Sequence, residues 1–130
     1  MSETVKILAF EDSRLDAELL KVLLTTGPYQ VRVISDGQLA LDAVKTESPP
    51  HIVICDINLP HVDGVHIIQF IRKNEQWKNL PVIAMSACLD YKTVNKAMLA
   101  GATSVLAKPY DPQRLQKEVL KLTGYERVEE

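Results

Sequence analysis

The chain has 130 residues, of which 46% are hydrophobic and 25% charged, and its formal net charge is -2 at pH 7. This length and composition predict one globular domain, and the small charge gives no electrostatic basis for binding nucleic acid or an anionic membrane. The chain lacks an apolar run of roughly 20 residues, as a membrane-spanning helix requires, and residues 1–4 lack the features of a signal peptide. The only cysteines are Cys55 and Cys88. We therefore expect a soluble cytoplasmic domain without a disulfide framework.

Five short runs of apolar, mostly β-branched residues alternate with amphipathic segments along the chain. The predicted strands are residues 5–10, 31–34, 52–56, 81–85 and 104–107. Helical periodicity follows each run, and side chains that can cap a helix mark most of the helix starts. The predicted caps are Ser13, Ser35, Asp90 and Asp111, and the third helix is predicted to span residues 64–73.

Apolar residues at helical spacing predict which side of each helix packs inward. In chain order, the predicted inward stripes are Leu15, Leu19, Val22 and Leu23; Ala40, Leu41 and Val44; Ile67, Ile68 and Ile71; Val94, Ala97 and Met98; and Leu115, Val119 and Leu122. Trp77 is expected to pack over the end of the third helix, although an exposed aromatic residue there could contact a partner.

The alternation of strands and helices predicts an α/β fold with a parallel sheet and helices on both faces. Right-handed crossovers favour a flavodoxin-like, three-layer α/β/α arrangement with five helices and five strands in the order 2-1-3-4-5. We expect residues 1–130 to form a single domain, with a core of about residues 4–123 and an acidic C-terminal tail at residues 124–130.

Polar side chains lie where the predicted strands end. Glu11 and Asp12 follow the first strand, Asp56 ends the third, Ser86 follows the fourth and Lys108 follows the fifth. The first and third strands are neighbours in the predicted order, so three carboxylates should share a small space at the ligand-binding edge of the sheet. Like charges this close repel one another unless a cation compensates them.

Magnesium suits such a site because it is a hard cation that takes carboxylate, water and phosphate oxygens. The predicted ligands are Glu11, Asp12, Asp56 and the backbone carbonyl of Asn58. Three acids, a divalent ion, a lysine and a hydroxyl are typical of phosphoryl transfer. We predict that Asp56 is the nucleophile and forms an aspartyl phosphate, with Lys108 and Ser86 hydrogen-bonded to the phosphoryl oxygens.

This pattern resembles the receiver domain of bacterial two-component response regulators, and the resemblance covers nearly the whole chain. The matching residues are Glu11-Asp12, Asp56, Pro60, Gly64, Ser86-Ala87 and Lys108-Pro109. The resemblance implies a Mg²⁺-dependent signalling module that takes a phosphoryl group from a phosphohistidine on a sensor histidine kinase or a histidine phosphotransfer protein. It further implies a backbone contact from Ala87 to the phosphoryl group and a cis peptide bond before Pro109. The resemblance also implies that the protein is not an enzyme, beyond phosphotransfer to itself and slow self-dephosphorylation.

The chain departs from the receiver pattern at two places. Typical receivers carry an aromatic residue or histidine three residues before the lysine, and its side chain rotates when the domain is phosphorylated; here that position is Val105. The signal is therefore expected to pass through the loop after Ser86 or the start of the fourth helix. Receivers that dimerise through the fourth and fifth helices commonly carry acidic residues at the positions of Thr103 and Ser104, so we expect a monomer or weak dimer.

Three alternatives to a phosphorylated signalling module stay open. An aspartyl-phosphate hydrolase would need a second Asp two residues after the nucleophile, where this chain has Asn58. A flavodoxin-like FMN binder would need a phosphate-cradling loop after the first strand, where Glu11 and Asp12 would repel phosphate. A phosphorylation-independent adaptor that keeps the fold is the main alternative because of Val105.

The sequence ends shortly after the last predicted helix. The resemblance is therefore to single-domain regulators, which act on a downstream protein target or relay phosphate, unless the chain is a fragment of a longer protein. Neither nucleic acid nor a membrane is expected as a partner.

Overall fold

The structure is a computed structural model that describes residues 4–25 and 27–124. Its strands are β1 (Val5–Phe10), β2 (Tyr29–Ile34), β3 (Ile52–Asp56), β4 (Val82–Ser86) and β5 (Ser104–Ala107). Its helices are α1 (Arg14–Leu23), α2 (Gly37–Thr46), α3 (Gly64–Lys73), α4 (Tyr91–Ala100) and α5 (Pro112–Thr123). Within these described residues, none of the helices combines the length and the apolar character needed to cross a membrane.

All strand pairs in the sheet are parallel, and the strand order is β2-β1-β3-β4-β5. The predicted fold class and strand order are confirmed. The central strands β3 and β4 are buried at every position, whereas β2 lies at an edge and has exposed side chains at alternate positions. Parallel pairing brings the carboxyl ends of all five strands to the same edge of the sheet.

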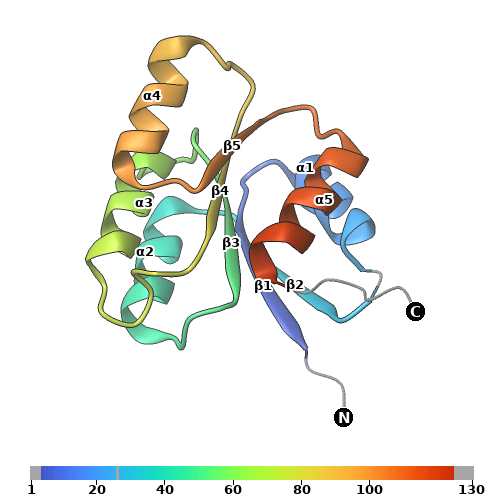
Figure 1. The fold of residues 1–130 in the computed structure, drawn as a ribbon. Helices are drawn as coiled ribbons and strands as arrows, with labels where there is room; N and C mark the ends of the chain where they lie inside the picture. The colour runs from blue at the N-terminus through green and yellow to red at the C-terminus, as the bar shows by residue number, and fades with distance from the viewer. Residues whose placement is uncertain (1–3, 26, 125–130) are drawn as a thin grey trace.

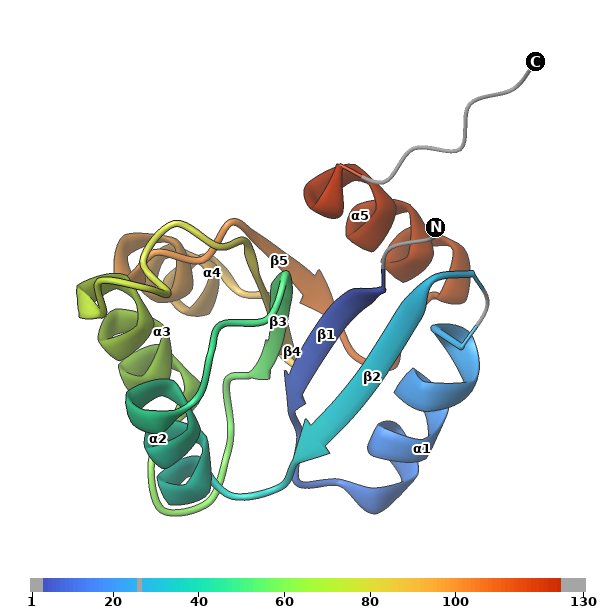
Figure 2. The same ribbon diagram turned by 90° about the horizontal axis from the view of Figure 1, so that it is seen from below.

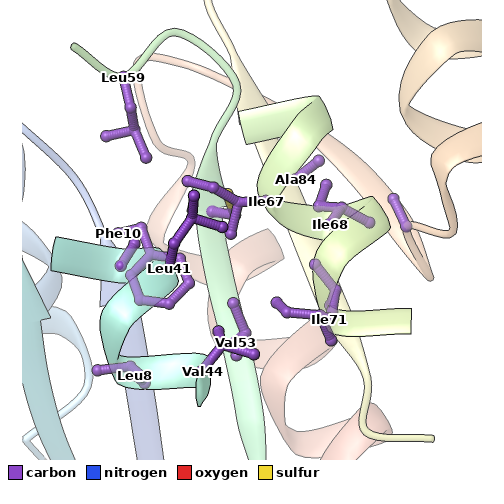
Figure 3. Packing of buried hydrophobic residues seen from close by; sticks show 14 of the residues in the cluster. Leu8, Phe10, Leu41, Val44, Val53, Leu59, Ile67, Ile68, Ile71 and Ala84 are labelled. Carbon is purple, nitrogen blue, oxygen red and sulfur yellow. The ribbon is translucent and has the colours of Figure 1, made fainter. Parts of the chain in front are cut away.

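Helices cover both faces of the sheet, with α1 and α5 on one side and α2, α3 and α4 on the other (Figures 1 and 2). Each face has its own apolar core. Phe10, Ile67 and Ile71 belong to the core beneath α2, α3 and α4 (Figure 3), and Leu20 and Leu115 belong to the core on the opposite face. The sheet therefore lies between two apolar cores, and its central strands β3 and β4 are covered on both faces.

The inward stripes of α2 and α3 are confirmed, because their predicted residues are all buried. On α5, Leu115 and Val119 are fully buried and Leu122 packs partly against the core. Trp77 is also buried, and its indole Nε1 donates a hydrogen bond to the Glu47 carbonyl oxygen at 3.1 Å. Trp77 therefore fixes the end of α2 as well as covering α3.

The inward stripe predicted for α1 is wrong except at Leu23, which packs partly against the core. Leu15 is 79% exposed and Val22 68% exposed, whereas Ala17, Leu20 and Leu24 are buried. This ten-residue helix carries two apolar faces, and periodicity alone does not tell which of them meets the sheet. The face with the alanine lies inward.

Two smaller predictions are also wrong. Met98 of α4 is exposed because the helix meets its neighbours through the small residues Ala97 and Ala100. The cap of α2 is Asp36 and not Ser35, and its carboxylate accepts hydrogen bonds from the backbone N–H groups of Gln38 and Leu39. The carboxylate one residue later satisfies two of the free N–H groups at the helix start.

Candidate functional site

Three carboxylates meet at the carboxyl edge of the sheet. One oxygen from each of Glu11, Asp12 and Asp56 lies within 4.8 Å of the others. Glu11 and Asp56 are buried, because they leave the neighbouring strands β1 and β3 at the centre of the sheet, whereas Asp12 is exposed. The structure therefore brings together the acidic residues that the sequence places after separate strands.

Lys108 supplies the positive charge facing this cluster. Its Nζ lies 3.1 Å from Glu11 and 3.1 Å from Oδ2 of Asp56, and 2.8 Å from Oδ2 of Asp16. Burial by itself lowers the pKa of Lys108, but hydrogen bonds to Asp16, Glu11 and Asp56 outweigh burial and hold this pKa above its ordinary value. Lys108 is therefore a permanent cation that offsets part of the repulsion among the acids.

Two residues at the site were missed by the sequence analysis. Asp16, in the first turn of α1, contacts Lys108 directly, and an acidic residue there ordinarily indicates only a favourable charge at a helix start. Tyr110 is buried and donates a hydrogen bond from its hydroxyl to Oε1 of Glu11 at 2.8 Å. Its position two residues after Lys108 was the one sequence feature that could have linked Tyr110 to the site. That position does not reveal in which direction the ring points.

The buried Glu11 carboxylate is held by several donors. Besides Tyr110 and Lys108, the backbone N–H of Ser13 donates to its Oε2 at 3.1 Å. Burial raises the pKa of Glu11, and these hydrogen bonds oppose that rise without cancelling it. The donors thus keep a costly buried carboxylate satisfied in one orientation.

Replacing Tyr110 by phenylalanine is expected to lower the free energy of unfolding by about 1–3 kcal/mol, because the buried Oε1 of Glu11 loses the Tyr110 hydroxyl as a donor. Urea unfolding followed by circular dichroism measures this change. The matched control is Tyr91→Phe, which removes a hydroxyl from a ring that is 84% exposed. Equal midpoints for the two variants would show that the buried hydrogen bond contributes nothing.

A cavity of about 340 Å³ opens over Asp56 and is lined by Asp16, Asp56, Asn58, Ala87, Lys108 and Pro109. The backbone N–H of Asn58 donates to Oδ1 of Asp56 at 3.0 Å, so both oxygens of this carboxylate accept a hydrogen bond. The peptide bond between Lys108 and Pro109 is cis. The cavity gives an incoming group access to Asp56 from the side of Lys108.

Ser86 is buried beside the site, but its hydroxyl is engaged within its own loop. It donates to the Cys88 carbonyl oxygen at 2.9 Å and accepts from the Cys88 N–H at 3.1 Å. Val105 lies on β5, half-buried, and packs against the core beneath α2, α3 and α4. The structure therefore places Ser86 at the site with its hydroxyl already hydrogen-bonded to the Cys88 backbone, without a phosphoryl group.

The acidic cluster fits a hard divalent cation. All three side chains offer oxygen donors, which is the set that Mg²⁺ takes in proteins, and one exposed carboxylate leaves the cluster open to solvent. Glu11, Asp12 and Asp56 are the side chains that would hold it. The bound ion would supply positive charge next to the reacting carboxylate.

Comparisons with known proteins agree with this arrangement. The chain is 32% identical over 125 residues to a probable chemotaxis protein CheY of Rhizobium etli, covering 95% of this chain and 96% of the relative. A putative response regulator from Chloroflexus aurantiacus has a crystal structure that superposes with a TM-score of 0.87 at 30% identity, covering 94% of this chain and 99% of that one.

A third similar protein carries the metal. It is the receiver domain of the sensor histidine kinase PA1611 from Pseudomonas aeruginosa, solved with a magnesium ion coordinated in the active site cleft, and it matches at 26% identity and a TM-score of 0.84 over 93% of this chain and 98% of that one. The acidic site described above is typical of Mg²⁺-binding receiver domains. Residues 7–120 match the family described as the response regulator receiver domain. The chain therefore belongs to the response regulator receiver domain family.

Proposed function

We propose that Asp56 is the residue that accepts the phosphoryl group. The observation that carries this assignment is its place at the centre of the cluster, with Oδ2 3.1 Å from Lys108 Nζ and the open cavity beside it. Receiver domains are phosphoacceptor modules of two-component signalling and not enzymes, and family membership implies a histidine kinase as phosphodonor. We further propose that the donor group is a phosphohistidine, on the kinase itself or on a histidine phosphotransfer protein.

In the proposed reaction an oxygen of Asp56 attacks the phosphorus of the donor. A P–O bond to Asp56 forms while the P–N bond to the donor histidine breaks, and the imidazole nitrogen keeps the electron pair. Lys108 donates hydrogen bonds to the phosphoryl oxygens, joined by the Ser86 hydroxyl and the backbone N–H of Ala87. Glu11, Asp12, Asp56 and the Asn58 carbonyl would hold a bound Mg²⁺.

The readout is proposed to run through the segment from Ser86 to Ala100. Ser86 donates a hydrogen bond to the Cys88 carbonyl oxygen, and this bond must break before the hydroxyl can donate to a phosphoryl group. A charge-assisted hydrogen bond from the Ser86 hydroxyl to the phosphoryl group stabilises the conformation in which Ser86 faces Asp56 by roughly 1.5–3 kcal/mol. This is enough to shift the loop before α4. A downstream protein target would then read the changed surface.

A phosphorylation-independent adaptor is the second candidate. It is favoured by Val105, which has no ring that could rotate and is held against the core. Amide hydrogen exchange, measured with and without a phosphoryl mimic, separates the two modes of action. Unchanged protection across residues 86–100 would contradict the proposed readout.

The phosphoacceptor assignment is tested by intact mass after incubation with Mg²⁺ and acetyl phosphate. We expect the wild type to gain the mass of one phosphoryl group and Asp56→Asn to gain none. Asp42→Asn, which removes an exposed carboxylate on α2, is the matched control and should gain mass as the wild type does. No gain by the wild type in excess donor would favour the adaptor.

We also propose that residues 1–130 act as one cytoplasmic receiver domain with a core of about residues 4–123, as a monomer or weak dimer. The free cysteines Cys55 and Cys88 support a reducing compartment. The uncharged residues Thr103 and Ser104 support weak self-association, since acidic residues there commonly accompany dimers of receivers. Analytical ultracentrifugation at increasing concentration tests the assembly state.

A further inference from the structure

The ammonium group of Lys108 is surrounded by carboxylates. An ammonium has three N–H donors, and the neighbours of Nζ are Asp16 at 2.8 Å, Glu11 at 3.1 Å and Asp56 at 3.1 Å. Each donor thus has a carboxylate acceptor. A phosphoryl oxygen can accept from Lys108 only if one of these three acceptors gives up its place.

Asp16 is the acceptor that can leave at the lowest cost. The Glu11 side chain is 2% exposed and is fixed by Tyr110 and Ser13, and Asp56 carries the reacting oxygen. The Asp16 side chain is 25% exposed and lines the cavity over Asp56, so its carboxylate can turn into water. Water solvates a released carboxylate at the surface, whereas a released buried one would stay unpaired.

We propose that Asp16 is a positioning residue. It pairs with the Lys108 ammonium before phosphorylation and is displaced from it by the incoming phosphoryl group. This inference rests on the proposed phosphorylation of Asp56. Asp16 slows the reaction in two ways. It competes for the lysine proton donors that the phosphoryl oxygens need, and it adds one negative charge to the cavity through which an anionic donor must enter.

The chemistry of the step itself does not involve Asp16. With acetyl phosphate, the P–O bond to Asp56 forms as the P–O bond to acetate breaks, and acetate leaves with the electron pair. Lys108 keeps its protons throughout and exchanges one hydrogen-bond acceptor, the Asp16 carboxylate, for a phosphoryl oxygen. Asp16 therefore acts on the reaction only through the lysine and the local charge.

The test is the rate of mass gain with Mg²⁺ and acetyl phosphate for the wild type and Asp16→Asn. We expect the variant to react roughly three- to tenfold faster, the range expected when one charged contact of the ground state, absent from the transition state, is weakened. Binding of beryllofluoride, a phosphoryl mimic, should tighten by a similar factor. Asp16→Glu, which restores the charge, should return both values toward the wild type.

The matched control is Glu18→Gln on the same helix. It removes one negative charge of a side chain that is 63% exposed and pairs only loosely with Lys21, at 3.8 Å, so its rate should equal that of the wild type. Asp16→Ala is a second variant that removes the acceptor altogether and should be at least as fast. A purely structural role of Asp16 would lower the urea midpoint without changing the rate.

The outcomes separate this inference from the proposed function. If the wild type gains a phosphoryl group at the same rate as Asp16→Asn and Asp16→Ala, the positioning role is wrong while the phosphoacceptor assignment stands. If Asp16→Asn reacts faster and Glu18→Gln does not, the inference is supported. If none of the proteins gains mass, the proposed function fails and this inference fails with it.

Discussion

Replacing Lys108 by methionine is expected to lower the free energy of unfolding by about 3 kcal/mol and to slow phosphorylation by at least roughly tenfold. Methionine keeps an unbranched side chain of nearly the same length but removes the charge that faces Glu11, Asp56 and Asp16. Two of these carboxylates are buried, so their repulsion is poorly screened by water. The same ammonium is lost as a donor to the phosphoryl oxygens.

Urea unfolding and intact mass measure the two effects. Lys21→Met is the control, because Lys21 makes only an exposed pair with Glu18 and such pairs contribute about 0–1 kcal/mol. Added Mg²⁺ should restore part of the stability of Lys108→Met, since a cation bound at the acidic cluster stabilises the folded state by mass action. A variant as stable as the wild type without Mg²⁺ would show that the acids do not need this lysine.

Replacing Gly64 by alanine is expected to cost about 3 kcal/mol and to impair phosphorylation, although alanine ordinarily favours a helix over glycine by about 1 kcal/mol. An added Cβ would lie 2.3 Å from the Asp56 carbonyl oxygen and 2.7 Å from Cα of Ile57. Both are backbone atoms, and the Gly64 N–H also donates to the Ile57 carbonyl at 2.7 Å. The end of β3, which carries the phosphoacceptor, and the loop after it would therefore have to move.

Gly27→Ala is the control for this substitution. Gly27 has a φ of +79°, and an added Cβ there would meet nothing within 4 Å, so the variant suffers only the strain of a left-handed residue, about 1–2 kcal/mol. Its phosphorylation rate should equal that of the wild type. Normal phosphorylation and stability in Gly64→Ala would contradict the close packing of α3 against the end of β3.

The sequence predicts well those parts of the fold whose apolar side chains can be buried in only one arrangement. The run ending in Asp56 is apolar throughout, as a strand covered on both faces must be, and it lies at the centre of the sheet. Ile67, Ile68 and Ile71 leave α3 with one apolar face that can meet the core. The acidic cluster follows from strand order, because adjacent parallel strands bring their ends together.

The parts that sequence reasoning missed depend on orientations that spacing does not determine. On α1 the apolar residues form two faces, and only packing shows that Leu20 and not Leu15 lies inward. Asp16 and Tyr110 reach the site through side-chain directions, from a helix start and from the residue after Pro109. These contacts are tertiary, so no local pattern along the chain reports them.

The most direct test of Asp56 as phosphoacceptor is to locate the modification itself. The protein is phosphorylated with acetyl phosphate and Mg²⁺, the acyl phosphate is reduced with borohydride to homoserine, and the digested peptides are sequenced by tandem mass spectrometry. We predict homoserine at position 56, in the peptide containing β3. Recovery of the modification at Glu11 or Asp12, or a stable phosphoryl group on a histidine such as His66, would contradict the assignment.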